Sequence, residues 1–216
     1  METIVKLKRI VLLILFVLLI ALTLTMNVSN IGSVGDISNK NNPAGIFAGH
    51  EQDAALFAGI YPVSEDNPFV IADFEELVFH LEYGTGIVVF GFPGCPRCKN
   101  AFPVLESAYN AMNMGRHAGF RGKIIYYDIF DDREADNERY REIVGFLEEF
   151  LPVDGNGNPR IYSPDVFFLA AGKVVGNHLD TVESLTDPSE PLNDEQRAEL
   201  LEIYKKLIEK VEDCGC

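Results

Sequence analysis

The chain of 216 residues contains no tryptophan, only four cysteines and few basic side chains. Its 18 Lys and Arg residues stand against 33 Asp and Glu residues, which gives a formal net charge of −15. A protein of this charge repels phosphate backbones, so we expect no nucleic-acid partner. The cysteines form two close pairs, too few and too clustered to hold distant loops together, which excludes a disulfide-rich scaffold. Redox or metal chemistry is the remaining use for such pairs.

The length and composition are those of one globular domain with an appendage. Hydrophobic residues make up 47% of the chain and charged residues 24%, so a buried core can form. We divide the chain into a signal anchor at residues 1–26, a flexible tether at 27–49 and a folded domain at 50–216. The tether is rich in Asn, Ser and Gly and has too few large apolar residues to order itself.

The N-terminal segment has the pattern of an export signal. Residues 10–26, IVLLILFVLLIALTLTM, carry no charge and follow Lys6, Lys8 and Arg9. Cations before an apolar run keep the N-terminus inside while the rest of the chain crosses the membrane. No small-x-small cleavage pattern follows, so we expect a single-pass anchor with the folded domain outside the cytoplasm. Cleavage, which would give a secreted protein, is the alternative; a buried core helix fits poorly because the run is apolar on every face.

Past the tether, strand and helix patterns alternate, which predicts an α/β fold with helices packed on a sheet. We expect helices at residues 71–82, 99–114, 134–150 and 194–211. We expect strands at residues 87–90, 123–129, 165–170 and 173–179, the last two forming an antiparallel hairpin.

The sequence Cys95-Pro96-Arg97-Cys98 follows the expected buried strand and begins the second helix. A thiolate at a helix N-terminus faces free N–H groups and the positive end of the helix dipole, so the pKa of Cys95 should fall below its free value of about 8.5. Cys95 is the expected nucleophile. Cys98 lies one helical turn away and is the expected resolving thiol. The sequence therefore predicts a redox-active disulfide with no further cofactor.

The two residues between the cysteines affect the start of the helix and the charge near the Cys95 thiolate. Pro96 in the first helical turn needs no N–H group and presets the backbone. Arg97 adds a positive charge beside the thiolate, which favours ionisation. The alternative for Arg97 is a solvated surface cation.

The C-P-x-C motif and the order strand, helix, strand, helix, hairpin, helix resemble the thioredoxin superfamily. A second point of resemblance is Ser163-Pro164, just before the hairpin. The resemblance implies a thioredoxin-like fold, a cis peptide bond at Pro164, and substrate alignment by Ser163 and Pro164 beside the two sulfurs. Residues 67–211 are further similar to extracytoplasmic thioredoxin-like proteins called bacteriocin transport accessory proteins.

Departures from the family pattern bear on activity. Gly94 stands where thioredoxins have Trp, Val89 where they have a buried Asp, and Tyr126 near their Lys. The chain therefore lacks the residues that the family uses to transfer a proton to or from the resolving cysteine. The direction of the reaction stays open between reduction, oxidation and isomerisation.

We hypothesise that the chain exchanges dithiols and disulfides with exported proteins or peptides and with a membrane or extracytoplasmic redox partner. The alternative is a non-catalytic accessory module that binds a peptide of the bacteriocin type for export on the same fold.

Weaker signals lie elsewhere in the chain. Cys214 and Cys216 are either an auxiliary redox pair that exchanges with Cys95 or an exposed thiol pair. A zinc site built from all four cysteines is disfavoured because the first pair lies at a strand–helix junction, and we expect no metal. Residues 154–158 begin like a calcium loop, but Pro159 replaces the required Gly, which indicates a turn.

Overall fold

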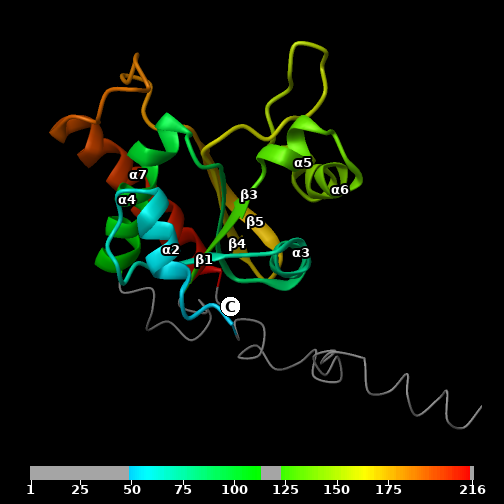
Figure 1. Cartoon of the computed structure of the whole chain (residues 1–216), viewed down its shortest axis with the longest axis horizontal. Helices are drawn as coiled ribbons and strands as arrows, with labels where there is room; N and C mark the ends of the chain where they lie inside the picture. Colours follow the sequence, from blue (N-terminus) through cyan, green and yellow to red (C-terminus); the bar gives the residue numbers. More distant parts are fainter. Residues whose placement is uncertain (1–48, 113–122, 215–216) are drawn as a thin grey trace, which may run out of the picture. The chain divides into compact units, whose positions relative to one another are not determined.

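The computed structural model describes residues 49–112 and 123–214 (Figure 1). Its helices are α2 (Asp53–Ile60), α3 (Phe74–Tyr83), α4 (Pro96–Ala111), α5 (Phe130–Glu134), α6 (Glu138–Leu147), the 3-10 helix η3 (Glu148–Phe150) and α7 (Asp194–Asp213). Its strands are β1 (Phe69–Ile71), β2 (Gly86–Gly91), β3 (Ile124–Asp128), β4 (Asp165–Ala170) and β5 (Lys173–Leu179).

The five strands form one mixed sheet in the order β1-β3-β2-β4-β5. Strands β1, β3 and β2 are parallel, while β4 runs antiparallel to β2 and β5 runs antiparallel to β4. This arrangement confirms the α/β class and the central mixed sheet flanked by helices. It also confirms the hairpin at both of its expected strands.

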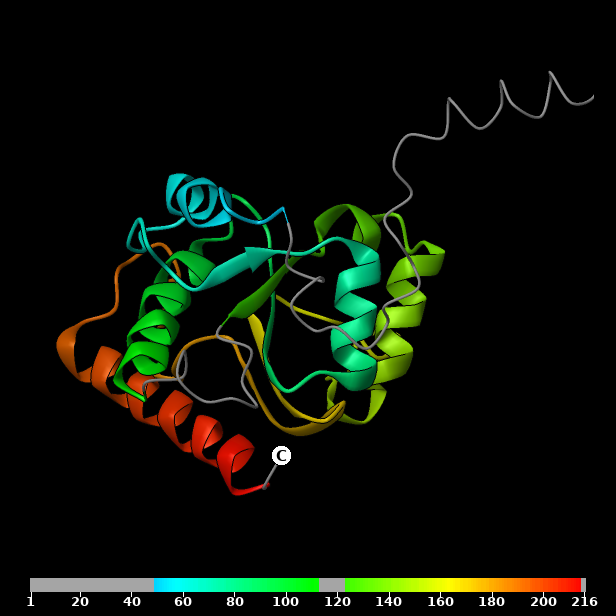
Figure 2. The same cartoon turned by 90° about the horizontal axis from the view of Figure 1, so that it is seen from below.

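The helices cover both faces of the sheet (Figure 2). On one face, α2, α4 and α7 bury a core that contains both active-motif cysteines. On the other face, α3 and α6 bury a second core. Because successive side chains of a strand point to opposite faces, Val89 belongs to the first core and Phe90 to the second. Strand β2 is buried at all of its positions, as its continuous apolar run predicts.

Local sequence explains where the helices begin. The Asp73 side chain accepts a hydrogen bond from the Glu76 N–H, and the Glu76 side chain accepts one from the Asp73 N–H, a capping box that begins α3. Asn193 and Gln196 form the same arrangement at the start of α7. Asp73 is thus the cap that the sequence predicts, but the helix begins after it, and Ile71 belongs to β1.

One expected helix begins later than the sequence predicts, and its last turn is a 3-10 helix. The pattern of residues 134–150 predicts a single helix, whereas α5 ends at Glu134 and α6 begins at Glu138. The chain turns at Asp136, whose φ of 43° is left-handed. Asn137 then accepts a hydrogen bond from the Tyr140 N–H and caps α6. Helix α2, strand β1 and the separate α5 were not expected from the sequence.

The described residues belong to one compact unit. The anchor at residues 1–26 and the tether at 27–49, apart from Gly49, lie outside the described residues. Within the ranges 49–112 and 123–214, no helix is long and apolar enough to cross a bilayer.

Candidate active site

The Cys95–Cys98 motif lies where the central strand β2 passes into helix α4. Between them, Gly94 has a φ of 92°, a left-handed conformation that glycine adopts without steric cost. The Cys95 N–H donates to the Phe92 carbonyl oxygen at 3.1 Å, which closes this turn. Cys95 is therefore held at the N-cap of α4, and Pro96 is the first residue of the helix. This is the position that the sequence predicts for both residues.

Cys95 and Cys98 form a disulfide. The Cys95 sulfur also accepts a hydrogen bond from the Cys98 backbone N–H, with 3.1 Å between the two atoms. Cys95 and Cys98 are both buried, at 2% and 0% exposed. In the reduced state, the same N–H group and the N-terminal end of α4 favour negative charge on Cys95.

The Ser163–Pro164 segment faces the disulfide from the loop before β4. The peptide bond between these residues is cis, the conformation that the resemblance implies. The Ser163 carbonyl oxygen lies 3.6 Å from the Cys95 sulfur. The Ser163 hydroxyl is buried and has no hydrogen-bond partner among the described residues. The structure therefore brings Cys95, Cys98, Ser163 and Pro164 together.

Asp180 contacts both the Cys95–Cys98 motif and the Ser163–Pro164 segment, and it was not predicted from the sequence. Its carboxylate forms an ion pair with the Arg97 guanidinium, and its backbone N–H donates to the Pro164 carbonyl oxygen at 2.8 Å. The hydrogen bond to Asp180 raises the pKa of Arg97. Asp180 has a φ of 73°, in the left-handed region that Asp and Asn enter more readily than other non-glycine residues. Arg97 is thus neither an unpaired charge nor a fully solvated cation.

An open groove of about 550 Å³ runs along the Ser163 side of the disulfide. Its lining includes Phe92, Arg97, Val153, Tyr162, Ser163 and Asp180. Val153 is 62% exposed and Tyr162 is 38% exposed, so part of the lining of this groove is apolar.

Two buried polar features lie close to the motif in the fold. The Tyr61 and Tyr126 hydroxyls hydrogen-bond each other at 3.1 Å, within the core that contains the cysteines. Asp165 follows Pro164 directly and is fully buried. Burial raises the pKa of Asp165 to about 8, although a hydrogen bond from Asn177 opposes the shift. Strand alternation places Asp165 with Phe167, on the sheet face opposite α4.

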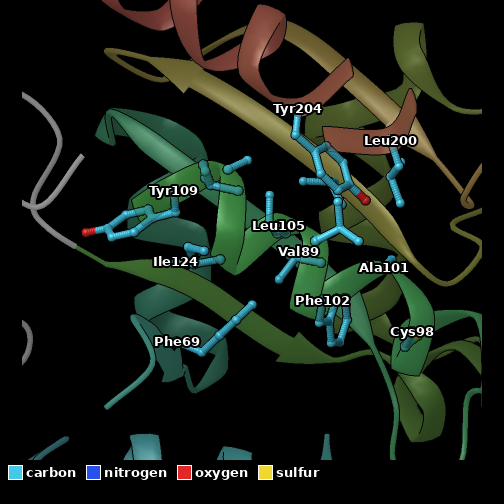
Figure 3. Close-up of a cluster of buried hydrophobic side chains, with 14 of the residues drawn as sticks. Phe69, Val89, Cys98, Ala101, Phe102, Leu105, Tyr109, Ile124, Leu200 and Tyr204 are labelled. Carbon is cyan, nitrogen blue, oxygen red and sulfur yellow. The ribbon is translucent and has the colours of Figure 1, made fainter. Parts of the chain in front are cut away.

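Cys214 lies away from the active motif. Figure 3 shows Leu200 of α7 beside Ala101 of α4, near Cys98. Tyr204, the next inward residue of α7, lies farther from Cys98, toward Leu105. From Leu200, α7 runs a further 14 positions, about 21 Å of helix, before it reaches Cys214 at its C-cap. Cys214 is exposed, and Cys216 lies outside the described residues. The structure does not bring Cys214 to the Cys95–Cys98 pair of the same chain.

We compared the chain with protein-family models, curated proteins and solved structures, and none of them matches significantly. A function for this chain is therefore argued from the geometry of its site.

Proposed function

We propose that the protein is a thioredoxin-like thiol–disulfide oxidoreductase that acts on exported proteins or peptides through Cys95 and Cys98. The observation that carries the proposal is the environment of one sulfur. Cys95 Sγ lies at the N-cap of α4, 3.1 Å from the Cys98 N–H nitrogen and 3.6 Å from the Ser163 carbonyl oxygen. A nucleophilic thiol, its resolving partner and a backbone segment for the substrate thus meet at one point.

The exchange requires no cofactor. In the reducing direction, the Cys95 thiolate attacks one sulfur of a client disulfide, the client S–S bond breaks, and one client thiolate leaves. The Cys98 thiolate then attacks Cys95 Sγ in the mixed disulfide, which forms the Cys95–Cys98 bond and releases the second client thiolate. Two electrons pass from the dithiol to the client. The oxidising direction is the reverse of the same steps.

Several features support the thioredoxin-like assignment. They are the strand order β1-β3-β2-β4-β5, the C-P-x-C motif after the central strand, and the cis bond at Pro164 before the hairpin. Val89 and Tyr126, the two positions where the family has Asp and Lys, are paired residues on the neighbouring strands β2 and β3. Tyr126 bonds to Tyr61, and burial raises the pKa values of both phenols, so this position offers neutral hydroxyls in place of an acid and a base.

The proposal includes a location. The N-terminal residues 1–26 would anchor the chain in a membrane with its N-terminus inside, and residues 27–49 would tether the folded domain outside the cytoplasm. Such a compartment is oxidising, so the Cys95–Cys98 disulfide could persist there. The enzyme then needs a membrane or extracytoplasmic partner to return Cys95 and Cys98 to their starting state after each cycle.

A mixed-disulfide trap tests this function. Cys98→Ser in the full chain should leave Cys95 able to attack but unable to release the client, so covalent client complexes that dithiothreitol dissolves should accumulate. Cys95→Ser should form none and should abolish insulin-disulfide reduction or thiol oxidation. Cys214→Ser/Cys216→Ser is the control and should retain activity. If client export survives Cys95→Ser/Cys98→Ser and no complexes form, the non-catalytic accessory module replaces the enzyme.

A further inference from the structure

A second groove, of about 540 Å³, lies on the other side of the active motif, between the first turn of α4 and the start of α7. It reaches the motif itself, because Gly94 and Pro96 line it on either side of Cys95. Its walls are formed largely by prolines at positions 62, 96, 103, 188 and 191. Proline fixes its own backbone angle, so these walls are rigid before any ligand arrives.

The charged residues that line this groove are both cations, Lys99 and Arg197. Both are exposed, and neither forms an ion pair with another residue in the described part of the chain. The groove beside Ser163 differs, because the two cations that line it, Arg97 and Arg133, pair with Asp180 and Glu134. The proline-walled groove therefore carries two cations without an ion-pair partner among the described residues, on a chain whose net charge is −15.

Asn100 fixes the geometry of the groove. Its amide nitrogen donates to the carbonyl oxygens of Pro188 at 3.4 Å and Glu190 at 2.9 Å. Its amide oxygen accepts a hydrogen bond from the Leu192 N–H at 3.3 Å. These three bonds join the N-terminal part of α4 to the loop before α7. They therefore hold the helices that carry Lys99 and Arg197 at a fixed position relative to each other. The two cations are presented at a preformed site.

We propose that the proline-walled groove binds an acidic segment of the client polypeptide, next to the client cysteine that reacts with Cys95. The inference rests on the proposed function, because it assumes that the occupant carries a thiol or disulfide. Gly94 and Pro96, on either side of Cys95, line the groove, so a client bound over the motif would lie beside it. A short acidic peptide segment can place its carboxylates beside Lys99 and Arg197 alone, whereas the extended phosphate arrays of nucleic acid or of an anionic membrane would also meet the acidic remainder of the protein.

The groove would therefore select clients by charge. Complementary charges across an interface speed association and exclude partners of the wrong sign more than they raise affinity. An acidic client would be attracted to the proline-walled groove by Lys99 and Arg197, while a basic client would be repelled by the same two residues. The groove beside Ser163 would contact the remaining, apolar part of the same segment.

Peptide binding tests the groove separately from the redox reaction. The probe is a labelled peptide in which Ser replaces the reactive Cys and two Glu residues flank it on each side, with matched Gln and Lys versions. At low ionic strength, fluorescence anisotropy with the full chain should show the Glu peptide binding about fivefold or more tightly than the Gln peptide, and the Lys peptide most weakly. Lys99→Glu/Arg197→Glu should abolish or reverse this order.

The matched control is Lys123→Glu/Lys173→Glu, which changes the net charge by the same amount. Both lysines are exposed and lie next to the strand ends opposite the motif, before β3 and at the start of β5. This control should keep the preference for the Glu peptide. Equal binding of the three peptides, or equal losses in the two double variants, would overturn the proposal.

A redox readout separates the two proposals. Exchange with the small neutral compound hydroxyethyl disulfide needs Cys95 and Cys98 but no groove. If the full chain lacks this exchange, the proposed function fails, whereas the peptide affinities still decide the groove. If the exchange proceeds and acidic peptides have no advantage in binding, the groove proposal alone is overturned.

Discussion

Arg97 and Asp180 form an ion pair that joins the first turn of α4 to the residue that follows β5. They are 83 positions apart in the chain. Through its N–H bond to the Pro164 carbonyl oxygen, Asp180 also holds the loop that faces Cys95. One residue therefore fixes both the charge beside the nucleophile and the segment proposed to align the substrate.

Asp180→Asn should make Cys95 more reactive. The substitution keeps the backbone bond to Pro164 but removes the charge that neutralises Arg97, which leaves a free cation near the thiolate. At pH 6, alkylation of the reduced protein by iodoacetamide should rise about two- to threefold. Because the reduced state is then favoured, the reduction potential should become more positive. Arg97→Gln should shift both quantities the other way, and equal rates in the three proteins would contradict this role.

Asp165 should make the domain less stable as the pH rises. Burial raises its pKa to about 8, whereas the unfolded chain should show about 3.9. The folded state therefore holds this proton more tightly, so stability is full below about pH 4 and is lost as the pH rises toward about 8. Relative to Asp165→Asn, the wild type should lose about 1 kcal/mol per pH unit between pH 5 and 7.

Urea unfolding followed by far-UV circular dichroism measures this difference, since the chain has no tryptophan. The other carboxylates titrate in both proteins, so only the difference between them reports on Asp165. Parallel stability curves for wild type and Asp165→Asn across this range would show that Asp165 is not the group responsible.

Gly172→Ala should destabilise the hairpin. Gly172 has a φ of 75°, its N–H donates to the Gly84 carbonyl oxygen at 2.7 Å, and a Cβ there would lie 2.0 Å from the Glu82 carbonyl oxygen. We expect a loss of about 2–4 kcal/mol in the free energy of unfolding. Gly145→Ala is the matched control, because its Cβ would meet no atom within 4 Å inside α6. That change should stabilise by up to about 1 kcal/mol, and similar urea midpoints for both variants would refute the prediction.

The strands and the helices with one apolar face could be predicted from the sequence because their signals are local. Strand β2 is a continuous apolar run, and the inward positions of α7, such as Leu200 and Tyr204, recur at helical spacing. Helix α2 gives no such signal, since its apolar residues lie on all sides and only Phe57 among them is buried. Strand β1 has three residues, too few for an alternating pattern. Asn137, a strong N-cap residue, was the available sign that the helix at 134–150 begins later.

The candidate site also contains some residues that local sequence predicts and others that it does not. Cys95, Pro96 and Cys98 sit within one turn of chain, so their geometry follows from a strand–helix junction. Ser163 and Pro164 could be placed only through a family resemblance, because nothing in their local sequence indicates a sulfur nearby. Asp180 had no local signal, since its partner Arg97 meets it through the tertiary fold.

The most direct test is the pH dependence of alkylation at Cys95 in the reduced full chain, with peptide mass spectrometry to identify the labelled residue. If α4 and the Cys98 N–H stabilise the Cys95 thiolate, iodoacetamide should label Cys95 first, with an apparent pKa below the value of about 8.5 of a free cysteine. Labelling that begins at Cys98, or a Cys95 pKa at or above that value, would contradict the proposed nucleophile.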